Sequence, residues 1–280
     1  MRSKNFSDSK PLLYLVATPI GNLSDFSPRA LEIIKDADLI ASEDTRVAGK
    51  LLSFFNIKKS MYSLHEHNEV EASLKVIDRI KAGEKVVYMS DAGYPAISDP
   101  GARLVDLALN NDINVSVIPG PSAFLSALVC SGLDSSHFYF HGFLSAKDGE
   151  RRKELEELKV RKETIIFYEA PHRIEKVLKD LLNVLGNRRI CIARELTKLH
   201  EEYIRINLEE IKDLDFETIK GECVVVVEGN KEEIKLSDEE IISLVEQEEK
   251  KGVSSKDAIK IVSELTKVNK NYIYKIYHRK

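Results

Sequence analysis

The sequence predicts an α/β protein that carries a small helical module at its C-terminal end. Three observations support this fold class. Short apolar runs recur along roughly the first 230 residues, and stretches with helical periodicity separate them. Strands that alternate with helices in this way are typical of a parallel sheet. Roughly the last fifty residues show helical patterns but no strand pattern, so we expect them to fold separately.

In the first half, each predicted strand is a short apolar run. The expected strands cover residues 12–17, 39–41, 85–89 and 115–118. The expected helices open at Ser27-Pro28 and, further on, cover residues 47–55, 69–82 and 101–110. A proline suits the first turn of a helix because that turn does not use the missing N–H.

A second series of elements follows the sequence Pro119-Gly120-Pro121. Its expected strands cover residues 138–143, 164–168, 190–193 and 223–228, and its expected helices cover 123–129 and 173–185. The strand that contains Cys223 is rich in β-branched residues and should be fully buried. We therefore predict a tail at residues 1–10, an N-terminal α/β domain at 11–121 and a C-terminal α/β domain at 122–230.

The remaining residues, 231–280, form the predicted helical module. Ser237 and Glu240 make a capping box that opens its first helix. A second helix should begin at Ser254 or Ser255, and a third near Asn269. The expected inward side chains are Ala258, Ile261, Val262, Leu265, Ile273, Ile276 and Tyr277. Residues 256–280 contain seven basic and two acidic side chains, so the end of the chain is a local basic patch.

Composition excludes some classes of protein. The formal net charge is -4, so the chain has no overall basic footprint for nucleic acid. Cys130, Cys191 and Cys223 lie in apolar stretches and form no C-x-x-C pair, which favours buried thiols over metal ligands or disulfides. No apolar run reaches the ~18 residues that a membrane span needs, and no signal peptide is evident. We expect a soluble cytoplasmic protein.

Two Gly/Pro-rich loops follow predicted strands and are candidates for ligand binding. One covers residues 90–101 and the other 119–123. In open α/β sheets, ligands bind outside the carboxyl ends of strands, and glycines let the backbone approach them closely. The alternatives are a tight structural turn for the first loop and a helix cap at Ser122 for the second. Because G-x-G-x-x-G and Walker patterns are absent from the sequence, ordinary dinucleotide and P-loop sites are disfavoured.

Charged side chains gather in several further loops. Residues 43–46 could form a salt bridge or orient a substrate hydroxyl or phosphate. The H-x-H pattern at residues 65–67 lacks further metal ligands, so polar contact or a helix cap is preferred. Residues 169–173 and 194–198 could equally form ion pairs between domains. The basic segment at residues 147–153 is either a solvated face or a contact for phosphates.

Taken together and in order, these motifs resemble those of the tetrapyrrole-methylase superfamily, and within it the branch that methylates ribosomal RNA of the small subunit. The motifs are A-T-P-I-G-N-L (17–23), E-D-T-R (43–46), H-N-E (67–69), S-D-A-G-Y-P-A-I-S-D-P-G (90–101), P-G-P-S-A (119–123), E-A-P-H-R (169–173) and A-R-E-L-T-K (193–198). The similarity covers about residues 12–229, and the helical module at 231–280 resembles the family's helix-turn-helix-like C-terminal piece, which implies that this module contacts RNA. Tyr94 departs from the family pattern, where a small threonine is expected, and this difference should alter the packing of its loop.

The resemblance implies a two-domain fold with S-adenosylmethionine in a cleft between the domains, no metal, and a homodimer. The implied reaction is 2′-O-methylation of a decoding-region cytidine, cytidine 1402, in the 16S rRNA of the small ribosomal subunit. By position, the implied cofactor contacts are Ile20, Asp91, Gly93, Tyr94, Ile97, Ser122, Ala123, Ala170, Arg194 and Glu222. The RNA contacts that we expect are Lys147, Arg151, Arg152, Arg173, Lys270 and Lys275.

Methyl transfer from a sulfonium to a ribose hydroxyl needs alignment of the reacting atoms and removal of a proton. The catalytic candidates are Glu43, Asp44, Arg46, His67 and Lys198. Arg46 would hold a phosphate or the developing oxyanion, and Asp44 or His67 would accept the proton. Two alternatives remain open: a methylase that acts on a small tetrapyrrole, and a non-catalytic nucleic-acid-binding regulator. The two strand-end loops argue against the second, since a pure binding protein needs no such cleft.

Overall fold

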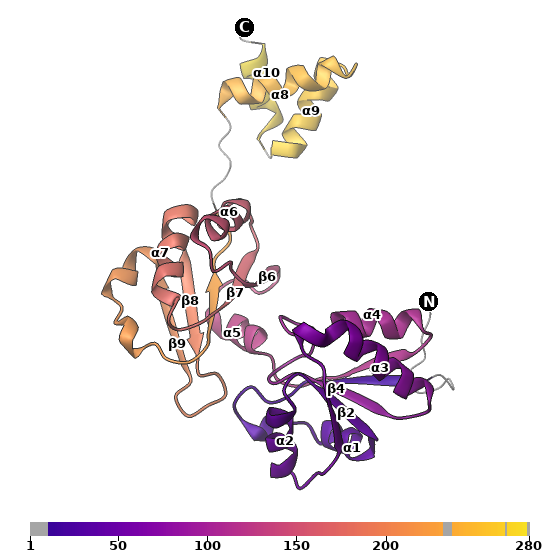
Figure 1. Ribbon diagram of the computed structural model, residues 1–280. Coiled ribbons are helices and arrows are strands. Elements are labelled where there is room, and N and C mark those ends of the chain that lie inside the picture. Colours follow the sequence, from indigo (N-terminus) through magenta and orange to yellow (C-terminus); the bar gives the residue numbers. More distant parts are fainter. Residues whose placement is uncertain (1–10, 232–236, 267, 279–280) are drawn as a thin grey trace. The chain divides into compact units, whose positions relative to one another are not determined.

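The computed structural model describes residues 11–231, 237–266 and 268–278, and Figure 1 shows its elements. The described residues up to Asn230 form one compact unit, and those from Lys231 onward form a second. The predicted tail at residues 1–10 lies outside the described residues.

The first unit contains two five-stranded sheets. Its strands are β1 (Leu12–Val16), β2 (Leu39–Ser42), β3 (Ser60–Ser63), β4 (Val86–Met89), β5 (Asn114–Ile118), β6 (Phe138–Phe143), β7 (Thr164–Glu169), β8 (Arg189–Arg194), β9 (Glu202–Asn207) and β10 (Cys223–Val227). Its helices are α1 (Pro28–Asp36), α2 (Thr45–Phe54), α3 (Glu69–Lys81), α4 (Ala102–Asn110), α5 (Ala123–Ser131), α6 (Asp148–Leu158) and α7 (Ile174–Leu185). Its short 3-10 turns are η1 (Leu23–Asp25), η2 (Glu66–Asn68), η3 (Leu208–Asp213) and η4 (Phe216–Thr218).

The first sheet has the strand order β3-β2-β4-β1-β5, and each of its strand pairs is parallel. Helices α1 and α2 pack against one face, and α3 and α4 pack against the other. Because both faces are covered, β2 and β4 are buried at every position. The predicted parallel sheet is therefore confirmed.

Strand β3 was not predicted from the sequence. It lies at the edge of the first sheet, where two of its four residues are exposed and two are half-buried. An edge strand does not need an apolar side chain on both faces, so its short Ser-Met-Tyr-Ser sequence carries no buried-strand pattern.

The second sheet has the order β6-β7-β10-β8-β9 and mixed strand directions. The predicted burial of β10 is confirmed at all five positions, and this strand runs antiparallel to both neighbours. Helices α6 and α7 cover one face, and α5 packs against the other. Neither β9, a half-exposed edge strand, nor the strongly charged α6 was predicted. Cys191 and Cys223 are buried as expected, but the prediction for Cys130 is wrong because that thiol is exposed at the end of α5.

The second unit contains α8 (Asp238–Lys250), α9 (Ser255–Thr266) and α10 (Lys270–Tyr277), packed around their own small core. The capping box of Ser237 and Glu240 is present at the start of α8. Two inward assignments on α9 are wrong: Leu265 is 71% exposed, and Ile261 is only partly buried and lies outside the core of this unit, where Ile259 is buried instead.

Candidate active site

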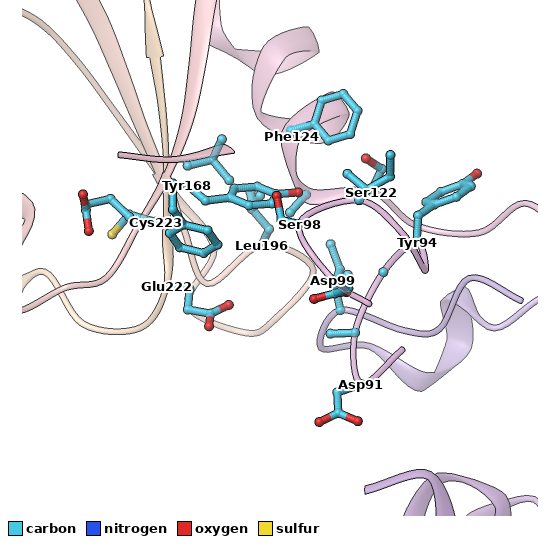
Figure 2. A pocket seen from close by; sticks show the side chains of 18 of the residues that line it. Asp91, Tyr94, Ser98, Asp99, Ser122, Phe124, Tyr168, Leu196, Glu222 and Cys223 are labelled. Carbon is cyan, nitrogen blue, oxygen red and sulfur yellow. The ribbon is translucent and has the colours of Figure 1, made fainter. Parts of the chain in front are cut away.

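A cavity of about 410 Å³ opens within the first unit, at the carboxyl ends of strands from the first sheet. Residues of the second sheet and of the loop after β8 form its other wall, as Figure 2 shows for Tyr168, Leu196 and Glu222. The carboxyl ends of parallel strands meet at one edge of a sheet, so the loops after β1, β4 and β5 come together there. Of the implied cofactor contacts, those that line this cavity are Ile20, Asp91, Gly93, Tyr94, Ile97, Ser122, Ala123 and Glu222.

Two implied contacts lie elsewhere. Among the described residues, the lining includes neither Ala170 nor Arg194. The guanidinium of Arg194 is paired with Glu202 at 2.5 Å, and the N–H of Ala170 donates to the carboxylate of Glu169 at 2.8 Å. Their immediate neighbours Glu169 and Glu195 line the cavity instead.

The loop from Ser90 to Gly101 is fixed at its beginning by the loop after β1. Thr18 and Gly93 exchange two backbone hydrogen bonds, of 2.9 and 3.0 Å, and the Thr18 hydroxyl donates to the carbonyl of Ser90 at 3.2 Å. The unexpected Tyr94 has a role here: its hydroxyl accepts a hydrogen bond from the N–H of Gly120 at 3.2 Å. This bond ties the two Gly/Pro loops together directly.

The far end of the same loop is held by two buried or half-buried side chains. The carboxylate of Glu69 accepts the N–H of Gly101 at 2.9 Å, and the hydroxyl of Tyr88 donates to the carbonyl of Pro100 at 2.9 Å. Asn68 accepts the N–H of His65 and donates to the carbonyl of Ser63. Glu69 of the H-N-E motif therefore supports the loop, whereas Asn68 holds the turn that follows β3.

Non-glycine residues adopt left-handed backbone conformations in both walls of the cavity. Ala96 and Ser98 have φ of 66° and 59° in the loop after β4, and Glu195 and Thr197 have φ of 51° and 67° in the loop after β8. Such conformations are costly, and they concentrate at functional sites where the surrounding structure enforces them. Their clustering around one cavity supports a ligand site there.

The cavity is acidic. Burial, followed by the charge of Glu43, raises the pKa of Asp99 to about 6. Burial also raises the pKa of Glu43 and of Asp91, and the carboxylates of Glu195 and Glu222 line the same space. Clustered carboxylates that repel one another favour a cationic ligand, because a positive charge relieves the repulsion.

The catalytic candidates separate into two groups. Glu43 and Lys198 line the cavity, and the ammonium of Lys198 lies 2.9 Å from the carboxylate of Glu195. Among the described lining residues, Asp44, Arg46 and His67 do not occur. Of the five candidates, only Glu43 and Lys198 therefore line the cavity.

Asp44 is poorly suited to accept a proton. Its carboxylate binds the guanidinium of Arg46 at 2.6 Å and caps α2 by accepting the N–H of Arg46. The hydrogen bonds from Arg46 lower the pKa of Asp44 to about 2. The backbone N–H of Asp44 donates to the carboxylate of Asp91 at 3.1 Å, so Asp44 supports the cavity through its main chain.

The candidate RNA contacts have different surroundings. The assignment of Arg151 is wrong: this residue is 1% exposed, and its guanidinium is bound to Asp180 at 2.6 Å. Arg173 is half-buried and pairs with Glu169. Arg152 pairs with Asp180 but keeps 60% of its side chain exposed. The other three candidates are exposed: Lys147 lies just before α6, and Lys270 and Lys275 lie on α10.

In the part of the chain that the structure describes, no three His, Cys, Asp or Glu side chains are grouped as ligands for a metal ion. The rings of His65 and His67 lie 6.0 Å apart. Within the same described ranges, no helix has the length and apolar character of a membrane span.

The fold and the cavity together define a methylase. The family model of tetrapyrrole (corrin/porphyrin) methylases matches residues 12–212, so the chain belongs to this family. Uroporphyrin-III C-methyltransferase from Thermus thermophilus, solved with S-adenosylhomocysteine, aligns over 78% of this chain and 96% of its own, with a TM-score of 0.54 and 18% identity. Diphthine synthase aligns over 78% of this chain and 89% of its own, with a TM-score of 0.59 and 18% identity. At these identities the likeness shows the fold alone.

Closer relatives are found among curated sequences. The ribosomal RNA small subunit methyltransferase I of Halalkalibacterium halodurans is 47% identical over 97% of this chain and 96% of its own length. The proteins of the same name from Bacillus subtilis and Vibrio cholerae are 42% and 41% identical, over 99% and 98% of this chain and 98% and 96% of their own lengths. Within the methylase family, the chain therefore falls among these methyltransferases.

Proposed function

We propose that this protein transfers a methyl group from S-adenosylmethionine to the ribose 2′-hydroxyl of cytidine 1402 in 16S rRNA. The observation that carries the proposal is the acidic cavity at the strand ends, formed by the same ordered motifs as those of the rRNA methyltransferase branch. An rRNA substrate is consistent with a cytoplasmic protein. We also propose a homodimer, as the resemblance implies.

The residues of the cavity suit the donor. Its volume lies within the usual range for small-molecule sites. Asp91, Asp99 and Glu222 surround the space where a sulfonium or an ammonium would be stabilised. We assign donor contacts to the eight implied residues that line the cavity. S-adenosylmethionine supplies a methyl group already activated by its sulfonium, so the protein's main task is alignment.

Glu43 is the best-placed group to accept the proton of the ribose hydroxyl. It follows β2 at the cavity wall, and its raised pKa makes it a stronger base than an ordinary glutamate. Lys198, on the opposite wall, can stabilise the developing alkoxide or a neighbouring phosphate. Arg46 is exposed at the start of α2, the helix that follows Glu43, and can hold a phosphate of the RNA. Further phosphate contacts fall to Lys147, Arg152, Arg173, Lys270 and Lys275.

The substrate can be tested directly. Labelled S-adenosylmethionine is incubated with the protein and with unmethylated small ribosomal subunits, naked rRNA or a tetrapyrrole, and the labelled product is mapped. Label at the cytidine ribose supports the proposal. Label that appears in the tetrapyrrole alone would replace it with a small-molecule methylase, and absence of donor binding in calorimetry would favour a binding protein.

The proton acceptor gives a first prediction. Replacing Glu43 by glutamine should lower the single-turnover methylation rate by about 10²- to 10⁴-fold, because general-base catalysis contributes that much. Asp44→Asn and His67→Ala are matched controls and should keep the rate within roughly tenfold, since neither side chain lines the cavity. Donor affinity is measured in parallel. A Glu43→Gln protein with the normal rate would contradict this assignment.

The raised pKa of Asp99 gives a second prediction. Its folded pKa of about 6 lies above the usual 3.8, so the folded protein holds its proton more tightly and the ligand-free protein loses stability as pH rises between these values. A cationic donor binds more tightly when Asp99 is an ionised carboxylate than when it is protonated. Donor affinity, measured by calorimetry from about pH 5 to about pH 8, should therefore fall as pH drops through the pKa of Asp99.

Asp99→Asn is the control for this pH dependence. The amide cannot titrate, so its donor affinity should be weaker than that of the wild type at neutral pH but nearly constant across the range. An equally steep pH dependence in Asp99→Asn would assign the titration to a different carboxylate of the cavity.

A further inference from the structure

Phe143 is an aromatic side chain that lines the cavity and has no role in the proposed chemistry. It is the last residue of β6, and 50% of it is exposed. A half-exposed aromatic ring inside a cavity presents a flat apolar face, on which the ring of a ligand can stack.

A β-bulge directs this ring into the cavity. In β6, Tyr139 contacts the core on the α6–α7 face of the sheet, and Phe140 contacts the core on the α5 face. Simple alternation would turn Phe143 to the face of Tyr139. The register of β6 against β7 shifts between Phe140 and Gly142, where Gly142 has φ of 84°.

The consequence of the shift is visible in the pairing. Phe143 aligns with Tyr168 of β7, which belongs to the α5 face and lines the cavity. The two ring centroids are 5.5 Å apart and the rings are tilted by 57°, so a base that stacks on one ring meets the other at an angle. Bulges commonly re-aim a side chain next to an active site, and here the extra residue moves Phe143 from the core side to the cavity side.

Hydrogen-bond acceptors lie beside this aromatic pair. Figure 2 shows Tyr168, Asp99 and Glu222 around the same space. After burial, the charges of both carboxylates contribute to the raised pKa of the Tyr168 hydroxyl. A carboxylate accepts hydrogen bonds from the exocyclic amine of a base such as cytosine. A flat face with acceptors at its edge has the two features that a nucleobase pocket needs.

We propose that Phe143 and Tyr168 form a stacking subsite for a nucleobase, whose exocyclic amine donates to Asp99 or Glu222. The inference rests on the proposed function, in which both substrates carry such a base: the adenine of the methyl donor and the cytosine of the target nucleotide. Phe143 acts as a binding residue in either case, and the experiment distinguishes the two sources.

The test compares Phe143→Leu, which keeps an apolar side chain but removes the ring, with Phe143→Tyr, which keeps the ring. Two quantities are measured for each protein: the affinity for S-adenosylhomocysteine by calorimetry, and the affinity for unmethylated small ribosomal subunits by filter binding. Phe143→Leu should weaken one of them by about 5- to 100-fold, the range of base–aromatic stacking, and Phe143→Tyr should stay within about twofold of the wild type.

Phe138→Leu is the matched control. Phe138 lies at the other end of β6, is 41% exposed and is not among the residues that line the cavity. Its replacement should change neither affinity. Circular dichroism and thermal unfolding show whether each variant is folded.

Each outcome bears on the proposal. Weaker binding of the subunit alone assigns the subsite to the RNA base, and weaker binding of S-adenosylhomocysteine alone assigns it to adenine. If Phe143→Leu behaves like the wild type in both measurements, or if Phe138→Leu shows the same losses, the stacking subsite is refuted. The proposed function fails separately, when the wild-type protein transfers no methyl group to rRNA.

Discussion

Replacing Asp180 by alanine should lower the free energy of unfolding of this protein by about 3–5 kcal/mol. Asp180 of α7 is 3% exposed, and its carboxylate binds the Nε and NH2 groups of Arg151 at 2.9 and 2.6 Å. Arg151 of α6 is itself 1% exposed. Removal of one partner leaves a guanidinium charge in an interior where water cannot solvate it, and that cost exceeds the value of the pair.

Part of the charge remains compensated in this variant. Arg151 also donates to Asp148 at 3.0 Å and to two backbone carbonyls, so we expect the lower half of the range. The measurement is chemical denaturation of the full chain. Glu175→Ala on the same helix removes an exposed ion pair with Lys179 and should cost less than about 1 kcal/mol. Equal effects of the two substitutions would contradict the buried-charge argument.

Replacing Gly101 by alanine should destabilise the protein by about 2–6 kcal/mol and weaken donor binding, since two costs combine. Gly101 has φ of 126°, a conformation that side chains rarely adopt. An added Cβ would also lie 2.5 Å from Cε1 of Tyr88, which is fully buried and whose hydroxyl is bonded to Pro100. Because the ring cannot move aside, the loop that lines the cavity must shift.

The two costs can be separated with a matched glycine. Gly83 has φ of 97°, but a Cβ there would meet no atom within 4 Å. Gly83→Ala therefore carries the backbone strain alone, about 1–3 kcal/mol, and should leave donor affinity unchanged. The excess loss in Gly101→Ala measures the clash with Tyr88. Normal donor affinity in Gly101→Ala would show that the loop position does not control the cavity.

The parts that could be predicted from the sequence are those where local chemistry is unambiguous. The strands β2, β4 and β10 are buried at every position, so their sequences are short, largely apolar runs. The loops after β1, β4 and β5 contain glycine and proline, residues typical of tight turns that let the backbone approach a ligand. Since the ends of parallel strands meet, the order of these loops already indicated one common cavity.

Other features left no local signal. The edge strands β3 and β9 are partly exposed, and α6 is dominated by charged residues, so their periodicity is weak. Arg151 lies in a basic run that is indistinguishable in sequence from a solvated face. Its ion pair depends on Asp180, which is 29 residues away and reaches it only when α6 and α7 pack together.

The sequence by itself determined the fold class, the family and the loops that surround the cavity, because each depends on residue type and local spacing. Tertiary structure alone decided which side chains face the cavity. Glu43 and Lys198 line it, whereas Asp44 is occupied by Arg46. The pKa of Asp99 is raised by burial and by the charge of Glu43, which follows another strand. Phe143 reaches the cavity because the register of β6 against β7 is shifted. Burial, charge and orientation arise from residues distant in the chain, so no local pattern could specify them.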